Sequence, residues 1–150
     1  MKNFSHIDDQ GQAKMVDVSA KHRQKRIATA SGEIHLNQET IQKIINNEIA
    51  KGNVLTTAKI AGIQAAKQTP NLIPLCHNIA LSQVDINFDI QETKITCQSQ
   101  AIAVDVTGVE MEALTAVSTA LLTIYDMCKA VDKTMVISEI KLDKKEKIDV

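Results

Sequence analysis

The segment Val84-Asp85-Ile86-Asn87-Phe88-Asp89-Ile90, within Gln83–Ile90, decides the fold class of this chain. Its apolar residues alternate with Asp or Asn at every step. Successive side chains of a β-strand point to opposite faces, so this pattern predicts a strand with one buried face and one wet face. Such a strand is typical of an antiparallel sheet that has a single covered face.

The neighbouring segments extend this strand into a sheet. Thr93–Val106 predicts a second strand, less regular and able to hold a bulge, that can form a hairpin with the first. Ile27–Leu36 is rich in β-branched residues and predicts a strand with a break at Ser31-Gly32. Met135–Leu142 predicts the last strand. The sheet therefore has four predicted strands.

Three helices are expected between these strands. Asn37 offers an N-cap to a helix that Gly52 can stop, with isoleucines recurring at helical spacing between them. A second helix is predicted over about 53–68, before the irregular segment Thr69–Asn78, which holds both prolines of the chain. Glu110–Ala130 carries a wide apolar stripe and predicts a long helix.

The predicted order of elements is β-α-α-β-β-α-β. With the first two helices counted as one layer, this is the ferredoxin-like βαββαβ arrangement, an α+β fold with a four-stranded antiparallel sheet. The helices should cover one face of the sheet and leave the other free for a partner or ligand. A length of 150 residues fits one domain spanning residues 1–150.

Composition excludes several classes of function. The net charge of −1 provides no basic field for nucleic acid, and the predicted strands offer only Phe88, on the face expected to be buried, for base stacking. The uncharged run Ala113–Tyr125 is too short to span a membrane. The three cysteines are widely spaced and read as thiols of a reducing cytoplasm.

Two clusters of residues could carry chemistry. Leu75-Cys76-His77 follows Pro74 in the irregular segment, where a histidine can meet a ligand, although a surface histidine beside a buried cysteine explains it equally. Asp126 and Lys129 share a helix face, and an ordinary surface ion pair is the simpler interpretation. Their apolar neighbours favour partial burial, which would let the lysine lose its proton more easily.

Other charged residues have sufficient structural explanations. Glu110 and Glu112 follow Thr107-Gly108 at a predicted helix start, where acidic side chains are favoured by the helix dipole. Four scattered cations would by default be solvated: Arg26, Lys51, Lys59 and Lys67. The sequence contains no phosphate-binding P-loop and no metal-ligand spacing, so an anion would need converging Lys and Arg side chains.

Taken together, long motifs resemble the cyclic pyranopterin monophosphate synthase family over about residues 5–142. They include two segments near the N-terminus and five internal segments that contain candidate site residues. The matching stretches are Ser5-His6-Ile7, Met15-Val16-Asp17-Val18-Ser19, Lys51-Gly52-Asn53-Val54, 58–67, Leu72–His77, 107–116 and 122–131.

This resemblance implies a lyase of molybdenum cofactor biosynthesis. The family converts 3',8-cyclo-7,8-dihydro-GTP into cyclic pyranopterin monophosphate and releases pyrophosphate. It also implies a ferredoxin-like fold assembled as a hexamer, a trimer of dimers, with active sites at the dimer interface. It implies no cofactor, although Mg²⁺ can accompany the triphosphate, and neither a nucleic-acid nor a membrane partner.

The resemblance also assigns roles to residues. Asp126 and Lys129 correspond to the catalytic acid/base pair, and Lys51 to a second proton-transferring lysine. Contacts to the guanine-derived part fall on Leu75, Cys76, His77, Met111 and Glu112, and Glu110 is a further substrate-binding candidate. Arg26 and Lys67 are candidates for the triphosphate.

Two departures from the family pattern leave an alternative open. Asp105-Val106 stands where the family has Gly-Lys, so an anion replaces a cation there. The tail lacks the family's glycines, and Lys145 falls at the position of its catalytic lysine. If Asp105 faced the triphosphate, affinity should suffer. In this alternative, the chain is a non-catalytic regulatory module on the same fold that binds a nucleotide or a pterin.

Overall fold

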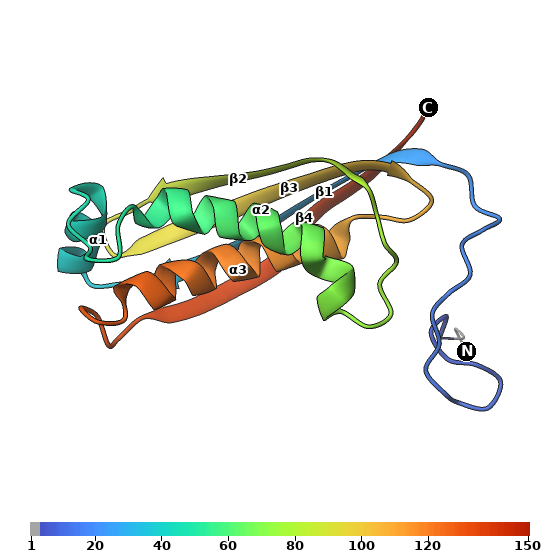
Figure 1. The fold of residues 1–150 in the computed structure, drawn as a ribbon, viewed down its shortest axis with the longest axis horizontal. Coiled ribbons are helices and arrows are strands. Elements are labelled where there is room, and N and C mark those ends of the chain that lie inside the picture. The colour runs from blue at the N-terminus through green and yellow to red at the C-terminus, as the bar shows by residue number, and fades with distance from the viewer. Residues whose placement is uncertain (1–3) are drawn as a thin grey trace.

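A computed structural model describes residues 4–150 and confirms the α+β architecture. Its four-stranded sheet has the order β2-β3-β1-β4, and every neighbouring pair is antiparallel. Helices α2 and α3 lie side by side across one face, and α1 sits at one end (Figure 1). The elements are β1 (Gln24–His35), α1 (Gln38–Ile45), α2 (Val54–Leu72), β2 (Leu81–Ile90), β3 (Lys94–Asp105), α3 (Glu110–Cys128) and β4 (Val136–Asp149).

The alternating segment forms β2 as predicted. Ile86 is buried, and Val84 and Phe88 pack against the core, whereas Asn87 and Asp89 are exposed on the outer face. The predicted hairpin with β3 also forms, with Ile90 opposite Ile95 in its last register pair. The irregularity expected in β3 lies instead in its pairing with the start of β2.

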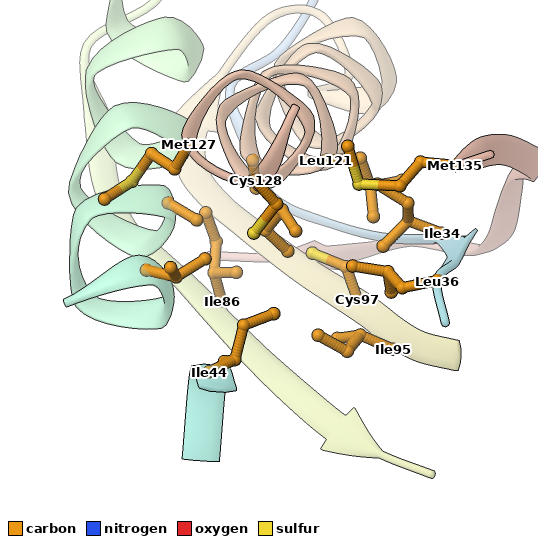
Figure 2. Packing of buried hydrophobic residues seen from close by; sticks show 14 of the residues in the cluster. Ile34, Leu36, Ile44, Ile86, Ile95, Cys97, Leu121, Met127, Cys128 and Met135 are labelled. Atoms are coloured by element: carbon orange, nitrogen blue, oxygen red, sulfur yellow. The ribbon is translucent and has the colours of Figure 1, made fainter. Parts of the chain in front are cut away.

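The core lies between the sheet and its two long helices. Isoleucines from β1, β2 and β3 meet Leu121, Met127 and Cys128 of α3 (Figure 2). Toward the start of α3, the packed residues are small, chiefly Ala28, Ala30, Ala101, Ala103 and Ala113. Small side chains let backbones approach closely, and Ser99 Oγ there donates to the carbonyl oxygen of Ala113 at 2.6 Å. The first turn of α3 is therefore held firmly against the sheet.

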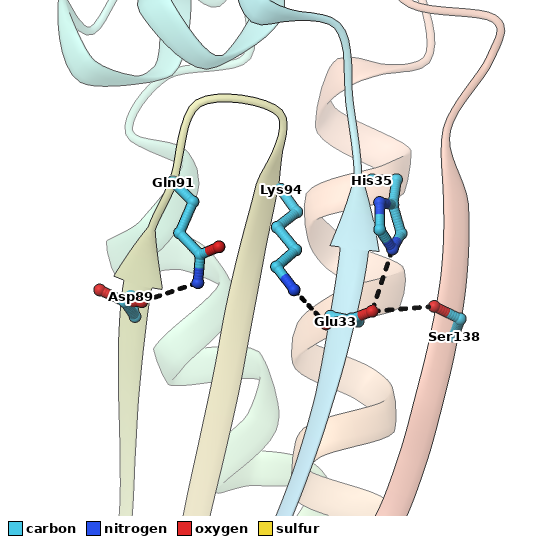
Figure 3. A network of polar contacts seen from close by, with 6 residues as sticks. All are labelled: Glu33, His35, Asp89, Gln91, Lys94 and Ser138. Carbon is cyan, nitrogen blue, oxygen red and sulfur yellow. Dashed lines mark hydrogen bonds and ion pairs between the residues drawn. The ribbon is translucent and has the colours of Figure 1, made fainter.

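The outer face of the sheet is polar. Glu33 on β1 accepts hydrogen bonds from Lys94 Nζ at 3.1 Å and from His35 Nε2 at 3.0 Å (Figure 3). These bonds, led by the one from Lys94, lower the pKa of the Glu33 carboxyl. This face differs in character from the apolar helix-covered face, as the alternation in β2 predicts.

Two predicted helix boundaries were wrong. The first helix ends at Ile45, not at Gly52, because Asn47 takes a left-handed backbone conformation with φ of 55°. The second helix continues through Pro70 to Leu72, so the irregular segment begins later than predicted. Proline in the last turn of a helix removes one hydrogen bond, a cost that the packing of α2 on α3 offsets.

Two strand predictions also need correction. Ser31-Gly32 does not break β1, although the pairing with β4 shifts register between Ser31 and Glu33. Gly32 is needed for close packing, since an added Cβ would lie 2.8 Å from Leu121 Cδ1. The last strand runs to Asp149 rather than ending at Leu142, and Lys145 pairs there with Ala28 of β1. Lys145 thus belongs to an ordered strand.

Candidate functional site

The start of α3 and the loop after α2 enclose a first cavity, which we call the histidine pocket. Its volume is about 160 Å³. Gly108 and Thr107 lie on its wall because the β3–α3 connection turns there. The pocket is lined by His6, Leu75, Cys76, His77, Ile79, Thr107, Gly108, Met111 and Glu112. The structure therefore brings together the two motifs that the sequence singled out separately.

Glu112 is the unusual group of this pocket. Its side chain sits in the first turn of α3 and the residue is only 3% exposed. Its Oε2 atom is buried and has no hydrogen-bond partner. Burial, with a smaller contribution from the charge of Glu110, raises the pKa of Glu112 to about 7. A carboxyl group with such a pKa can donate or accept a proton near neutral pH.

The neighbours of Glu112 are also constrained. His77 Nε2 lies 2.6 Å from the carbonyl oxygen of Val16, so this nitrogen carries the proton and donates it to that oxygen. Nδ1 of a neutral His77 ring is then an acceptor. Burial and the nearby Glu112 raise the pKa of the Cys76 thiol, which keeps it protonated and makes it a poor nucleophile.

A second cavity, which we call the basic pocket, adjoins the first. Its volume is about 150 Å³, and Gly108 lines both cavities. Arg26 of β1 projects a guanidinium whose Nη2 donates to the carbonyl oxygen of Val106 at 3.3 Å, while its buried Nε has no partner. The lining residues are Arg26, Ile27, Gly108, Val109, Glu110, Lys145, Glu146 and Lys147.

The charges of the basic pocket are partly compensated. Lys145 Nζ lies 3.6 Å from Glu110 Oε1. The Glu110 carboxylate lies directly over Gly108, where a Cβ atom would force it to move. Three cations from adjacent strands, Arg26, Lys145 and Lys147, can hold an anion that displaces these contacts.

A third cluster lies at the opposite end of α3, and we call it the lysine–aspartate cluster. Asp126 Oδ1 lies 2.9 Å from Lys129 Nζ, and Asp126 Oδ2 lies 3.1 Å from Lys51 Nζ. The two lysines hold the pKa of Asp126 below its ordinary value, Lys129 contributing more, and Asp126 raises that of Lys129. The cluster can transfer protons and bind an anionic group.

The expectation that apolar neighbours would bury this pair was wrong for the single chain. The side chains of Asp126 and Lys129 are 55% and 57% exposed. The apolar neighbours Ile124, Met127 and Cys128 turn toward the sheet, whereas Tyr125 remains partly exposed. Because Lys129 is solvated and paired, its pKa moves up rather than down. Any activation of this lysine requires a change in its surroundings.

The two ends of α3 cannot act together within one chain. Glu112 and Asp126 are separated by about 21 Å along the helix axis, at 1.5 Å per residue. Groups that act on the same atoms must approach to roughly 3–3.5 Å. One chain therefore presents two partial sites, pockets at one end and the lysine–aspartate cluster at the other.

The structure leaves some candidates outside these clusters and adds others. Lys67 is exposed on α2 and lines neither pocket, and Asp105 also lies outside both linings. Asp105 Oδ1 instead accepts from the Val106 N–H at 2.7 Å, so its charge is not directed into the basic pocket. No sequence pattern indicated a role for His6, although Ser5-His6-Ile7 is one of the stretches that resemble the family. No pattern indicated a role for Lys147.

Two further findings concern the part of the chain that is described, residues 4–150. Within it, no three His, Cys, Asp or Glu side chains are grouped so that they could hold a metal ion. None of the helices in the same range combines the length and apolar character needed to cross a membrane.

Comparisons with known proteins agree with these features. The chain is 54% identical to a Desulfitobacterium hafniense protein named cyclic pyranopterin monophosphate synthase, over 95% of this chain and 88% of that protein. It is 52% identical to a Thermoanaerobacter protein of the same name, over 95% and 92%. It is 58% identical to a Chlorobaculum tepidum molybdenum cofactor biosynthesis bifunctional protein but spans only 46% of its length. A model of the MoaC family matches residues 15–147, and the chain therefore belongs to the MoaC family.

Proposed function

We propose that this chain is a cyclic pyranopterin monophosphate synthase of molybdenum cofactor biosynthesis. The observation that carries the proposal is the junction of the two pockets at Gly108. One pocket offers a buried carboxyl group and an imidazole to a polar heterocycle. The adjoining pocket offers cations to phosphate groups, so a nucleoside triphosphate derivative fits across them.

The proposed substrate is 3',8-cyclo-7,8-dihydro-GTP. Its guanine-derived part would occupy the histidine pocket against His77 and Glu112, and its triphosphate would reach Arg26 and Lys145 in the basic pocket. A sugar hydroxyl then attacks the α-phosphorus, loses its proton, and forms the cyclic phosphate as pyrophosphate leaves. Placed cations stabilise the negative charge that develops on this phosphate.

Ring opening and reclosure require several proton transfers, for which the lysine–aspartate cluster is suited. We propose that a second copy of the chain brings this cluster to the pockets, because one copy holds them too far apart. Leu122 and Tyr125 are 60% and 37% exposed beside Asp126, which supports contact with another subunit. Exclusion of water there would lower the effective dielectric constant from ~80 to ~20. Interactions between charges would then be about four times stronger.

Contact with a second subunit would also change Lys129. Removal of water disfavours its ammonium form and lowers its pKa from the raised value of the isolated chain. The dimer would repeat as a hexamer, a trimer of dimers, as the family resemblance implies. The three free cysteines, two of them buried, support a reducing cytoplasm as the setting. A role for Lys67 at the triphosphate stays a prediction.

The first experiment measures pyrophosphate release by the purified protein supplied with 3',8-cyclo-7,8-dihydro-GTP. Lys129→Ala should abolish turnover with an unchanged far-ultraviolet circular dichroism spectrum, because an exposed lysine supports no core contact. Lys133→Ala, which removes an exposed cation four residues later in the connection between α3 and β4, is the matched control and should remain active. Wild-type turnover by Lys129→Ala would remove its proposed catalytic role.

A second experiment tests whether sites are shared between subunits. Lys129→Ala and Glu112→Ala are each expected to be inactive alone. If a site combines Glu112 of one subunit with Lys129 of the other, co-assembly restores about a quarter of the activity. Half the dimers are then mixed and each holds one intact site. No recovery in verified mixed assemblies would contradict the shared site.

A further inference from the structure

The segment that precedes β1 begins with a small hairpin. Lys14 N–H donates to the carbonyl oxygen of His6 at 2.9 Å, and Asp8 N–H donates to that of Gln12 at 2.9 Å. The Asp8 carboxylate accepts from the N–H groups of Gln10 and Gln12 at 2.9 and 2.8 Å. The hairpin is therefore closed by its own bonds, and His6 stands at its open end, next to the chain that continues toward the body.

This hairpin is fixed at the histidine pocket. Val16, two residues beyond its last bond, accepts the 2.6 Å hydrogen bond from His77 Nε2. Among residues 4–18, this is the one hydrogen bond that reaches the folded body in the described part of the chain. The attachment point is thus a residue of the pocket itself, and His6 lines that pocket together with Cys76 and Glu112.

The packing of the hairpin gives it no evident role in stability. His6 and Ile7 are exposed, as are Phe4 and Met15, at 79% and 47%. A segment that buries so little apolar surface contributes little to the core. Its ordered turn and its attachment to a pocket residue are better explained by what it places in the pocket.

We propose that His6 is a further substrate-contacting residue, carried on the N-terminal hairpin to the wall of the histidine pocket. The inference rests on the function proposed above and adds a residue to its binding site. His77 commits Nε2 to Val16, whereas the ring of His6 makes no hydrogen bond to any residue from 4 to 150. Both ring nitrogens of His6 therefore remain available to the heterocycle.

The chemistry of the pocket fits a guanine-derived ring. Glu112 Oε2 is buried without a hydrogen-bond partner. An N–H group of a bound ligand that reaches this atom would satisfy it. His77 Nδ1 accepts a second N–H. The carbonyl edge of such a ring needs a donor, and a His6 N–H supplies one. His6 would thus complete a set of donors and acceptors that Glu112 and His77 begin.

The test compares His6→Ala and His6→Gln with His22→Ala, a control at another exposed histidine of the N-terminal segment. For pyrophosphate release from 3',8-cyclo-7,8-dihydro-GTP, His6→Ala should raise KM about 2- to 13-fold, the effect of one lost hydrogen bond. His6→Gln keeps a donor and should recover part of this loss. All three variants should melt like the wild type, since none is buried.

A second measurement separates contact from hairpin integrity. Asp8→Ala breaks the turn and should raise KM in the wild type, but should add little in the His6→Ala background if the hairpin acts through His6. If the wild type is active and His6→Ala has the same KM and kcat, the inference about His6 is overturned and the proposed function stands. Wild type that releases no pyrophosphate would overturn the proposed function. Equilibrium affinities for GTP, compared between His6→Ala and His22→Ala, would then decide whether His6 contacts a nucleotide.

Discussion

Replacing Glu112 by glutamine should stabilise the protein at neutral pH. Burial raises the pKa of this carboxyl from its ordinary 4.5 to about 7 in the folded state. Between these pH values the folded state holds a proton that the unfolded state has released. The free energy of unfolding therefore falls as the pH rises through this window and levels off above it. Glutamine does not ionise, so the variant should lack this part of the pH dependence.

The size of the effect follows from the same two values. A pKa difference between folded and unfolded states corresponds to about 1.4 kcal/mol per pH unit. The interval from 4.5 to about 7 thus represents about 3 kcal/mol at pH 8. Glu112 is 3% exposed, so solvent screening reduces this figure little. Domain stabilities are roughly 5–15 kcal/mol, which makes the difference large enough to measure.

The assay is urea denaturation of wild type and Glu112→Gln from roughly pH 4 to 8, at one fixed protein concentration because assembly couples to unfolding. The variant should match the wild type near pH 4 and exceed it increasingly toward pH 8. Glu48→Gln, at an exposed glutamate, is the control and should follow the wild type throughout. Parallel profiles for the wild type and Glu112→Gln would refute the account of a buried acid at this position.

Three further changes test the fold and the site. Gly62→Ala should lower the free energy of unfolding by about 1–3 kcal/mol in urea, because a Cβ there would collide with Ile86 and lie 2.8 Å from the carbonyl oxygen of Ala116. Asp132→Ala should cost about 1–3 kcal/mol, and the loss should shrink at acid pH, because hydrogen bonds outweigh burial and lower the pKa of Asp132. Asp126→Asn should lower the denaturation midpoint only slightly, because solvent screens its exposed ion pairs, and should abolish pyrophosphate release.

The sheet was predictable because its signal is local. The alternation in 83–90 predicted β2 with the correct faces, and the order of strands and helices predicted the ferredoxin-like arrangement. The boundaries were less predictable. Asn47 ended α1 through its own backbone conformation, and Pro70 was accommodated inside α2. The apolar periodicity that predicted each helix records neither of these features.

The candidate site was predicted in part. The spacing of Asp126 and Lys129 correctly predicted a pair on one helix face, whereas their exposure contradicted the expected burial. Lys51 joined them through the family resemblance alone, because nothing near it in sequence indicates a partner 75 residues away. His6 lies in a matching stretch, Ser5-His6-Ile7, but received no role, since the contacts that place it involve residues from several elements.

The sequence by itself determined the fold class, the family and the identity of most residues in the pockets. Periodicity and long motifs carry this information because they depend on residues close together along the chain. The tertiary structure decided the raised pKa of Glu112, the exposure of Lys129 and the separation of the two ends of α3. These properties depend on the solvent that each group loses and on neighbours from distant segments. No local pattern records those neighbours, and the packed chain alone establishes them.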